Sequence, residues 1–264
     1  MSLGLVHENK LQRMISVPSF HPESTMEQTL EYLAAQIRRI ITPETTHIGV
    51  GVPSVVDVRR GIVYDAVNIP SWKEVPMKEY LEDQFHVPVA VNNDANCYAM
   101  GVYGSYPADK KPELLVTVTL GTGVGIGIVE EGRLFCGVNC GAGELGSLPY
   151  RDSIIEDYCG KKFFYETGWE SKTAFEAAQA GDPAALALLD QLGHNLGDML
   201  IAVLYAYDPS HIALGGGIAN NFPFFRAALM QHLRDHFPYQ RTLDRLQVDV
   251  FTDNDIPVIG ASLL

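Results

Sequence analysis

Several features that define other protein classes are scarce or missing in this chain of 264 residues. Its four cysteines are too few for a disulfide framework at this length, so a reducing, cytoplasmic location is expected. No window approaches the roughly 20 apolar residues of a membrane span. The opening MSLGLVHENK lacks the basic region and apolar core of a secretory signal. The sequence therefore predicts a protein that neither enters a membrane nor is secreted.

Basic residues are also scarce. The chain has 19 Lys and Arg against 32 Asp and Glu, which gives a formal charge of −13. Such a surface repels nucleic-acid phosphates and anionic lipid headgroups, so we expect no nucleic-acid and no membrane partner. The overall composition, 47% hydrophobic and 19% charged, is that of a globular protein long enough for one large domain or two small ones.

The first part of the chain alternates between helical and extended patterns. Ser24 and Glu27 have the spacing of a capping box before a helix expected over 26–41. The other elements expected here are strands or extended runs over 47–53, 61–66 and 87–91, and helices over 77–85 and from about 92 to 100. This alternation predicts a partly parallel sheet with helical cover.

The second part begins with extended runs that follow one another closely. Strands are expected over 114–120, 126–130 and 133–136, where an antiparallel meander fits the short connections. A long apolar helix is expected over 183–207 and a strand over 211–214. A polar, proline-containing stretch near 106–111 suggests a boundary between two lobes, 1–107 and 108–264.

Asp94 is the first candidate for chemistry. It follows the strand that ends at Val91, within the run Asn92-Asn93-Asp94, so it should lie at the mouth of a sheet. A carboxylate there could accept a proton from a substrate hydroxyl, as the base in phosphoryl transfer does. Alternatively, Asn93 or Asp94 only caps the following helix.

Two glycine-rich segments are candidates for binding phosphate or nucleotide. Gly121-Thr122-Gly123-Val124-Gly125 lies between two strands, so neither the Rossmann fingerprint nor the P-loop applies, since both need a following helix. Its glycines would let backbone N–H groups approach phosphate oxygens, but a simple hairpin turn explains it equally well. The run 215–217 is all glycine and follows a strand, which suits either a packed ribose or ring, or a tight strand-to-helix turn.

Metal sites are poorly supported. Cys136 and Cys140 form no recognised zinc spacing with a second pair, and Cys159 stands alone. His232 and His236 are four residues apart on an expected helix, where a solvated face is favoured over a metal site.

Taken in order, seven segments resemble the ROK family of sugar kinases and sugar-responsive repressors. They are IGVGVPSVVD (48–57), NIPSW (68–72), VAVNNDANCYAMG (89–101), VTVTLGTGVGIGIV (116–129), GAGELG (141–146), DPSHIALGGGIA (208–219) and PVIGASLL (257–264). The resemblance implies an α/β, actin-like ATPase (ribonuclease H-like) fold, with two lobes and an interlobe cleft. It also implies an ATP-dependent kinase that acts on a small-molecule sugar with Mg²⁺, and a homodimer by family analogy.

The resemblance also assigns residues. Asp94 matches the base that deprotonates the sugar hydroxyl, usually the 6-hydroxyl of a hexose. The positions that match sugar contacts are Asn68, Asn93, Glu144, Glu166 and Ser147, where the family often has His. Those that match the ATP phosphate loop are Gly121, Thr122 and Gly123, and those that match the adenosine side are Gly215, Gly216 and Gly217.

Two departures from the family pattern affect the expected activity. The D-x-G-G-T motif of the family's first strand occurs nowhere in the 264 residues. Either the sequence begins after that strand or this is a natural variant with an impaired nucleotide site. The family's zinc-binding cysteine cluster is reduced to Cys159, so we expect no zinc, with the aromatic run 163–165 filling the space instead.

These features support two functions. The first is an ATP-dependent hexose or N-acetylhexosamine kinase, glucokinase-like, with Asp94 as general base. The second is a sugar-binding regulatory protein of the same family that has lost kinase chemistry.

Overall fold

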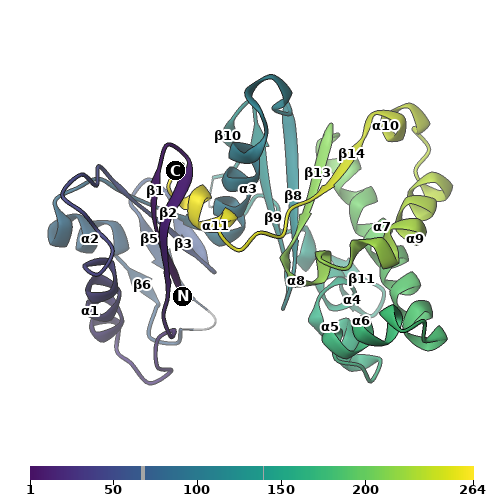
Figure 1. Ribbon diagram of the computed structural model, residues 1–264, viewed down its shortest axis with the longest axis horizontal. Coiled ribbons are helices and arrows are strands. Elements are labelled where there is room, and N and C mark those ends of the chain that lie inside the picture. The colour runs from purple at the N-terminus through teal and green to yellow at the C-terminus, as the bar shows by residue number, and fades with distance from the viewer. Residues whose placement is uncertain (67–68, 139) are drawn as a thin grey trace. The chain divides into compact units, whose positions relative to one another are not determined.

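The computed structural model describes residues 1–66, 69–138 and 140–264. Its contacts divide the chain into two compact units. The first unit comprises Met1–Lys111, Arg133–Ala142 and Asp253–Leu264, and the second comprises Pro112–Gly132 and Gly143–Thr252. In Figure 1 the chain is coloured from purple at the N-terminus to yellow at the C-terminus. Each unit is described in turn.

The first unit contains three small sheets and several helices. Its elements are β1 (Ser2–His7), β2 (Lys10–Ser16), α1 (Met26–Ile37), β3 (Ile48–Val52), β4 (Val55–Asp57), β5 (Ile62–Tyr64), β6 (Glu74–Val75), α2 (Met77–Phe85), β7 (Val89–Asn93), α3 (Asp94–Ser105), the 3-10 turn Ala108–Lys110, β10 (Arg133–Leu134) and α11 (Ile256–Ala261). β1 and β2 form an antiparallel hairpin, β3 and β7 form a parallel pair, and β4, β5 and β6 form an antiparallel sheet. The strand expected over 47–53 and the helix expected over 77–85 are confirmed, and the strand expected over 87–91 is present two residues later, as β7.

The capping box of α1 is real but lies one residue later than predicted. The Thr25 hydroxyl accepts from the Gln28 N–H at 3.3 Å, and the Gln28 side-chain oxygen accepts from the Thr25 N–H at 2.9 Å. The prediction that Ser24 and Glu27 form this box was wrong. The sequence holds both pairs at the same spacing, and the helix begins at Met26, which makes Thr25 the adjacent cap.

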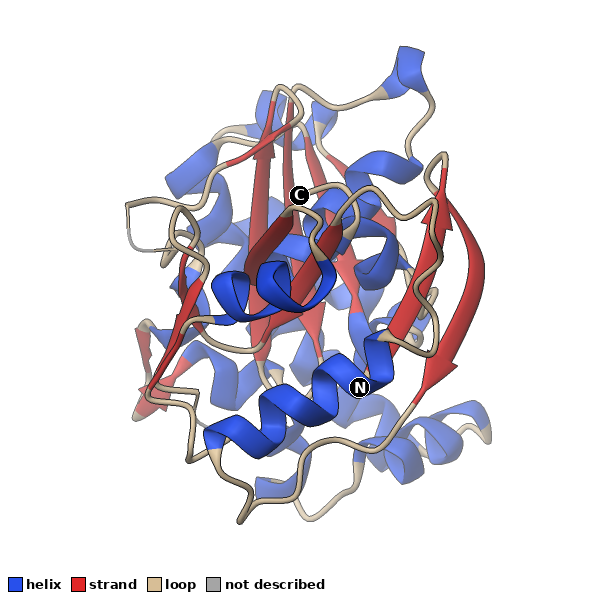
Figure 2. Ribbon diagram, turned by 90° about the vertical axis from the view of Figure 1, so that its left-hand side faces the viewer, coloured by secondary structure: helices blue, strands red, loops and turns tan. Residues whose placement is uncertain are grey.

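The core of the first unit lies between α1 and the strands, which Figure 2 shows with helices in blue and strands in red. It includes the buried side chains Leu30, Leu33, Ile37, Val52, Val63, Trp72, Leu81 and Val91. The indole N–H of Trp72 donates to the Thr29 hydroxyl at 2.6 Å, so these two buried polar groups are paired with each other.

The second unit is built on a mixed sheet. Its elements are β8 (Leu114–Leu120), β9 (Val124–Glu130), the 3-10 turn Glu144–Ser147, β11 (Pro149–Tyr150), β12 (Ser153–Ile154), α4 (Ile155–Cys159), α5 (Lys161–Glu166), α6 (Ser171–Gln179), α7 (Pro183–Tyr207), β13 (His211–Gly215), α8 (Gly216–Ala219), α9 (Phe222–His236), α10 (Gln240–Arg245) and β14 (Gln247–Val250). The strands within this unit are ordered β9-β8-β13-β14, with β8 and β9 antiparallel and β13 parallel to both β8 and β14. The expected β8–β9 antiparallel turn and the strand after α7 are confirmed.

The direction of these strands brings the two glycine segments together. β8 and β13 run parallel side by side, with Leu115 opposite His211 and Thr119 opposite Gly215. Parallel strands end at the same edge of a sheet, so the residues after Leu120 and after Gly215 emerge next to each other.

α7 covers this sheet and extends over the 25 residues predicted for it. Asp182 caps it by accepting from the N–H groups of Ala184 and Ala185 at 2.8 and 2.9 Å, and Pro183 stands at its first turn. Its fully buried face includes Leu189, Leu192, Leu196 and Leu200. Among the described residues, no helix combines the length and apolar character needed to cross a membrane.

Candidate functional site

The turn between β8 and β9 is tightly held. The Gly121 N–H donates to the Gly123 carbonyl at 3.0 Å, and the Lys161 N–H donates to the Gly121 carbonyl at 2.9 Å. A Cβ on Gly121 would meet no atom within 4 Å, so this residue borders open space. The start of α5 therefore anchors a loop whose outer side remains accessible.

The other side of this turn is closed by Glu156 of α4. Its carboxylate accepts from the Val124 N–H at 2.8 Å, and a Cβ on Gly123 would collide with the same carboxylate. Gly123 is therefore needed for packing behind the loop, whereas Gly121 and Thr122 present its front. No local sequence motif identified Glu156 beforehand.

The three glycines after β13 have three different roles. Gly215 is the buried last residue of the strand. Gly216 has a φ of +81°, and a Cβ there would collide with the Leu120 carbonyl oxygen, so this position requires glycine. Gly217 has no atom within 4 Å of its Cβ position and, like Gly121, faces open space.

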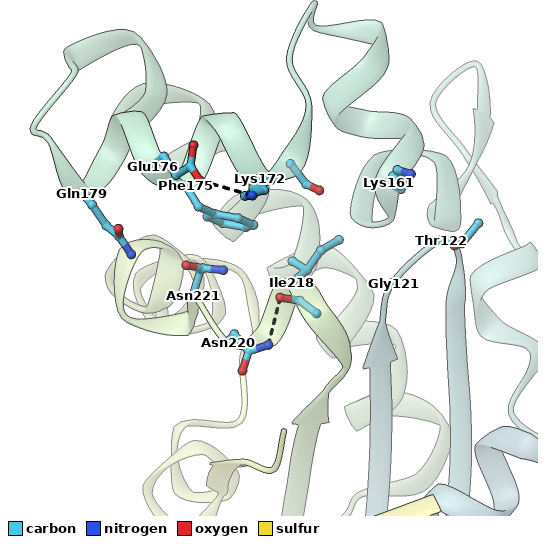
Figure 3. Close-up of a pocket in the computed structure, with 12 residues that line it drawn as sticks. Gly121, Thr122, Lys161, Lys172, Phe175, Glu176, Gln179, Ile218, Asn220 and Asn221 are labelled. Atoms are coloured by element: carbon cyan, nitrogen blue, oxygen red, sulfur yellow. Dashed lines mark hydrogen bonds and ion pairs between the residues drawn. The ribbon is translucent and has the colours of Figure 1, made fainter. Parts of the chain in front are cut away.

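Gly121, Thr122 and Gly217 line one pocket of the second unit, with a volume of about 580 Å³ (Figure 3). The other residues that line it are Lys161, Ser171, Lys172, Phe175, Glu176, Gln179, Ile218, Asn220 and Asn221. This volume lies within the range of small-molecule and cofactor sites, roughly 300–1,000 Å³. Gly123, Gly215 and Gly216 do not line it; they support its walls.

The pocket combines cationic, polar and aromatic groups. Figure 3 shows residues of α6 on one side, and on the other Ile218 of α8 with Asn220 and Asn221, which lie between α8 and α9. The Lys172 ammonium lies 3.8 Å from the Glu176 carboxylate, and the Asn220 amide donates to the Gly217 carbonyl at 3.4 Å. A hydrogen bond with the Tyr165 hydroxyl raises the pKa of Lys161, which keeps that ammonium charged. The lysine ammonium groups suit phosphates, and the aromatic ring of Phe175 suits a flat ring.

Sequence reasoning missed the α5 and α6 side of this pocket. Lys161 and Lys172 come from short helices with no motif that signals a ligand. The Lys161-Lys162 pair after Gly160 was the one available signal of a cationic site.

Asp94 is the first residue of α3 in the first unit. Its neighbour Asn93 is the helix cap and accepts from the Ala95 N–H at 2.8 Å; the Asp94 carboxylate accepts from the same N–H at 2.9 Å. Asp94 as a residue is exposed, yet the protein packed around its carboxyl group removes enough water to raise its pKa. Asn93 therefore caps the helix, and the Asp94 carboxylate next to it remains accessible to solvent.

The asparagines that precede Asp94 are held by several partners. The Asn93 amide donates to the Ser54 carbonyl at 3.3 Å, and the buried Asn92 accepts from the Asn96 amide at 2.9 Å and from the Cys140 thiol at 3.3 Å. This network fixes the backbone from which the Asp94 side chain projects. The predicted sugar contact Asn68 lies outside the described residues.

The sugar contacts predicted in the second unit are on its surface and do not line the pocket. Glu144 and Ser147 are the two ends of one 3-10 turn, and both are exposed. Glu166 ends α5, where its carboxylate lies 3.6 Å from the Lys162 ammonium.

The segment in the place of the family's zinc cluster is a small aromatic core. Phe163 and Phe164 are buried and their rings contact each other, and Phe164 also contacts Phe175. The expectation that Tyr165 joins them was wrong: it is 53% exposed, because helix α5 turns it to the opposite side. Burial raises the pKa of the Cys159 thiol.

The side chains that could bind a metal ion are dispersed over the described part of the chain. Within residues 1–66, 69–138 and 140–264, no three or more His, Cys, Asp or Glu side chains gather in a way that could hold an ion. The described residues therefore present no preformed group of side-chain ligands for Mg²⁺. Mg²⁺ commonly keeps several waters and binds through phosphate oxygens, so it does not require such a group.

The prediction of a solvated face at His232 was wrong. His232 is buried between α7 and α9, with its Nε2 2.6 Å from the Asp198 carboxylate and its Nδ1 3.1 Å from His194 Nδ1. The helical spacing of His232 and His236 was read correctly, and their rings stack. His236 is exposed, so the expected solvated face holds at His236 but not at His232.

Comparisons with known proteins agree with this architecture. A sequence profile of the ROK family matches residues 3–168 and 164–264. The chain is 31% identical to a glucokinase of Halalkalibacterium halodurans, over 82% of this chain and 75% of that one. It is 26% identical to a xylose repressor of Bacillus spizizenii, over 77% of this chain and 58% of that one.

The fold is that of the solved family members. The ROK hexokinase of Thermus thermophilus superposes with a TM-score of 0.78 at 26% identity, over 100% of this chain and 97% of that one. The architecture is thus the actin-like ATPase fold expected from the sequence, and the chain belongs to the ROK family.

Proposed function

We propose that this protein is an ATP-dependent kinase that phosphorylates a hydroxyl of a hexose or N-acetylhexosamine. The observation that carries the proposal is the pocket in which the loop after β8 and the loop after β13 meet beside Lys161. Membership of a family that includes a glucokinase supports it. We also propose a cytoplasmic location, since the cysteines are free thiols suited to a reducing compartment.

In this proposal the pocket holds ATP. Backbone N–H groups of the 121–123 turn and the Lys161 ammonium bind phosphate oxygens, and the neighbourhood of Gly217 and Phe175 receives the adenosine. Mg²⁺ would accompany the nucleotide and offset phosphate charge. The contribution of the protein is to position the phosphates and keep water away from them.

Asp94 is the proposed general base. Its carboxylate would take the proton of the sugar hydroxyl as that oxygen attacks the terminal phosphorus, and the bond to ADP breaks. A carboxyl group that is reachable by solvent but has a raised pKa suits this step, because it binds a proton more strongly than an ordinary aspartate. We assign sugar contacts to Asn68, Asn93, Glu144, Ser147 and Glu166 by family resemblance.

The test is sugar-dependent release of ADP from Mg-ATP by the purified chain, with glucose, N-acetylglucosamine, N-acetylmannosamine and fructose. Asp94→Asn keeps the hydrogen bond from Ala95 but removes the base, so turnover should fall by about 10²–10⁴-fold. Asp109→Asn, an exposed change in the same unit, is the matched control and should keep full activity. Equal turnover in Asp94→Asn and the unaltered chain would exclude Asp94 as the base.

A second function is favoured by one specific observation. One relative is a xylose repressor, which suits a sugar-binding regulatory protein without kinase chemistry. Calorimetry distinguishes the two: this alternative predicts sugar binding without ATP binding, and any sugar-dependent ADP release rules it out. Light scattering would test the homodimer that we propose by family analogy.

A further inference from the structure

Two cysteine side chains lie together next to the asparagines that precede Asp94. Cys136 and Cys140 belong to the loop after β10, and both are free thiols. The side-chain nitrogen of Asn96 lies 3.6 Å from each of the two sulfurs. Asn92 also contacts both: its side-chain nitrogen lies 3.8 Å from the Cys136 sulfur, and its oxygen accepts from the Cys140 thiol at 3.3 Å. The two thiols therefore share the same polar neighbours.

The backbone of this loop brings the chain back to Cys136. The Ala142 N–H donates to the Cys136 carbonyl at 3.1 Å. Gly137 has a φ of +70°, and a Cβ there would lie 3.3 Å from the Ala142 side chain. The loop is thus closed around the two cysteines, and a bond between their sulfurs requires only a local rearrangement.

The two thiols differ in access and in reactivity. Cys136 is half-buried between the exposed residues Phe135 and Gly137, whereas Cys140 is buried. The hydrogen bond from the Cys140 thiol lowers the pKa of Cys136, and the same bond raises the pKa of Cys140. Because the thiolate is the nucleophilic form of cysteine, Cys136 is the reactive group and Cys140 is its buried partner.

The other two cysteines provide an internal comparison. Cys97 and Cys159 are buried, and burial raises the pKa of both thiols. Neither is accessible or inclined to ionise, so neither should react with a reagent from solution.

We propose that Cys136 and Cys140 form a peroxide-sensitive modification site, at which the two thiols are converted reversibly into a disulfide. The Cys136 thiolate attacks one oxygen of hydrogen peroxide, the O–O bond breaks, and Cys136 becomes a sulfenic acid as hydroxide leaves. The Cys140 sulfur then attacks the Cys136 sulfur, and its proton leaves with the sulfenic hydroxyl as water. Two thiols are oxidised and one peroxide is reduced to two waters. In a reducing compartment such disulfides are transient, which suits a reversible site.

The disulfide changes the contacts that hold the residues before Asp94. The Asn92 side-chain oxygen accepts from three donors: the Asn93 N–H at 2.8 Å, the Asn96 amide at 2.9 Å and the Cys140 thiol at 3.3 Å. Oxidation removes the thiol hydrogen. It also draws the two sulfurs to about 2 Å, closer than any contact between thiols, so at least one sulfur moves relative to the asparagines. We therefore expect the start of α3 to be held less firmly in the oxidised chain.

The test begins with the whole reduced chain, which is treated with hydrogen peroxide, unfolded and labelled with N-ethylmaleimide. Trypsin cuts after Arg133 and Arg151, so both cysteines fall in the single peptide 134–151. After peroxide this peptide should be two hydrogens lighter and carry no label, whereas Cys97 and Cys159 should be fully labelled. Dithiothreitol should restore both labels.

Substitutions assign the two roles. Cys140→Ser removes the partner thiol, so the Cys136 sulfenic acid should persist and be trapped by dimedone. Cys136→Ser should leave Cys140 a free thiol after peroxide. Cys159→Ala is the matched control and should form the disulfide as the unaltered chain does. Alkylation of the folded, unaltered chain by iodoacetamide needs no substitution: Cys136 should react about tenfold or more faster than the other three.

Hydrogen exchange tests the effect on the neighbouring helix without any assay of activity. Amides of 92–96 should exchange faster after oxidation and recover after reduction. The expected effect on catalysis rests on the proposed function: sugar phosphorylation should fall by about tenfold or more on oxidation and return with dithiothreitol. A reduced chain without kinase activity would contradict the proposed function, while the labelling and exchange measurements would still decide on the thiol site.

The proposal is overturned by full labelling of all four cysteines after a large excess of peroxide, or by equal alkylation rates at the four thiols. A cross-link between peptide 134–151 and the Cys97 peptide 79–110 would equally contradict the pairing. A complete disulfide with unchanged exchange over 92–96 would overturn its effect on the residues around Asp94.

Discussion

The two units treat their sheets differently. In the second unit, β8 and β13 are paired on both sides within one sheet, and their glycine loops are fixed by backbone contacts to Leu120 and Lys161. In the first unit the described strands are divided among three small sheets, in which β1 pairs with β2 alone and β3 pairs with β7 alone. The pocket of the second unit is bordered by glycine loops at strand ends, whereas the groove of the first unit, about 770 Å³ in volume, is lined by residues along β1 and β3.

This contrast shows that sites of similar volume can have different origins. Gly121 and Gly217 face space that the chain leaves open around a held loop, while Gly4 and Gly49 face a helix and leave space only at their backbone edges. Glycine therefore opens space in front of a loop in the second unit, and in the first unit it lets a helix approach the strands closely.

The largest expected effect tests how rigidly the second unit is built. Gly216→Ala places a Cβ at a φ of +81° against the Leu120 carbonyl, so we expect a loss of about 2–4 kcal/mol in the free energy of unfolding and loss of nucleotide binding. Gly217→Ala is the matched control for stability, since its Cβ position is open. Its free energy of unfolding should equal that of the unaltered chain. Urea unfolding and ATP titration measure both. Equal stability of the two variants would contradict the structural role given to Gly216.

The second prediction concerns the strand edges. Amides of β1 and β3 should exchange with solvent about tenfold or more faster than those of β8 and β13, because they are paired on one side only. Hydrogen-exchange mass spectrometry of the whole chain measures this difference. Equal protection of all four strands would remove the contrast between the units.

The third prediction concerns charge in the pocket. Lys161→Gln keeps the backbone hydrogen bond to Gly121 but removes the ammonium, so affinity for ATP should fall by about tenfold. The control is Lys162→Gln, one residue along the same helix and outside the pocket lining. Isothermal titration should show the loss for the first variant alone. A similar loss in both would mean that net charge, not the pocket, attracts the nucleotide.

Much of the fold could be predicted from the sequence because its signals were local. β8 reads as a continuous apolar run and α7 as an apolar face with a capping aspartate, and both have the predicted limits. The capping box was ambiguous because Ser24–Glu27 and Thr25–Gln28 have the same spacing, and only the first helical turn decides between them.

What could not be predicted depends on tertiary neighbours. Gly121 and Gly123 look alike in the sequence. In the structure Gly121 borders the pocket, whereas Gly123 packs against the Glu156 carboxylate, and only the tertiary position of Glu156 distinguishes them. Periodicity placed His232 and His236 on one side of α9, but His232 is buried through its contact with Asp198 of α7 while His236 stays exposed. The groove has no sequence signature at all, since it arises from which strands pair.

The smallest expected effect is on stability near Asp94. Because the pKa of Asp94 is raised, its carboxyl group binds a proton more tightly in the folded chain than in the unfolded chain. The free energy of unfolding therefore falls as pH rises from the ordinary aspartate range through the raised pKa. Asp94→Asn removes this cost, so at pH 7 its Tm should be slightly above that of the unaltered chain, and the two should converge as pH falls toward the ordinary aspartate range. Each kcal/mol gained raises Tm by roughly 2–4 °C, and solvent access to Asp94 keeps the gain small. Asp109→Asn should show no such pH-dependent difference in scanning calorimetry. A lower Tm for Asp94→Asn at pH 7 would mean that the Ala95 hydrogen bond to the ionised carboxylate outweighs its desolvation, and that Asp94 is held as an ordinary helix-terminal carboxylate.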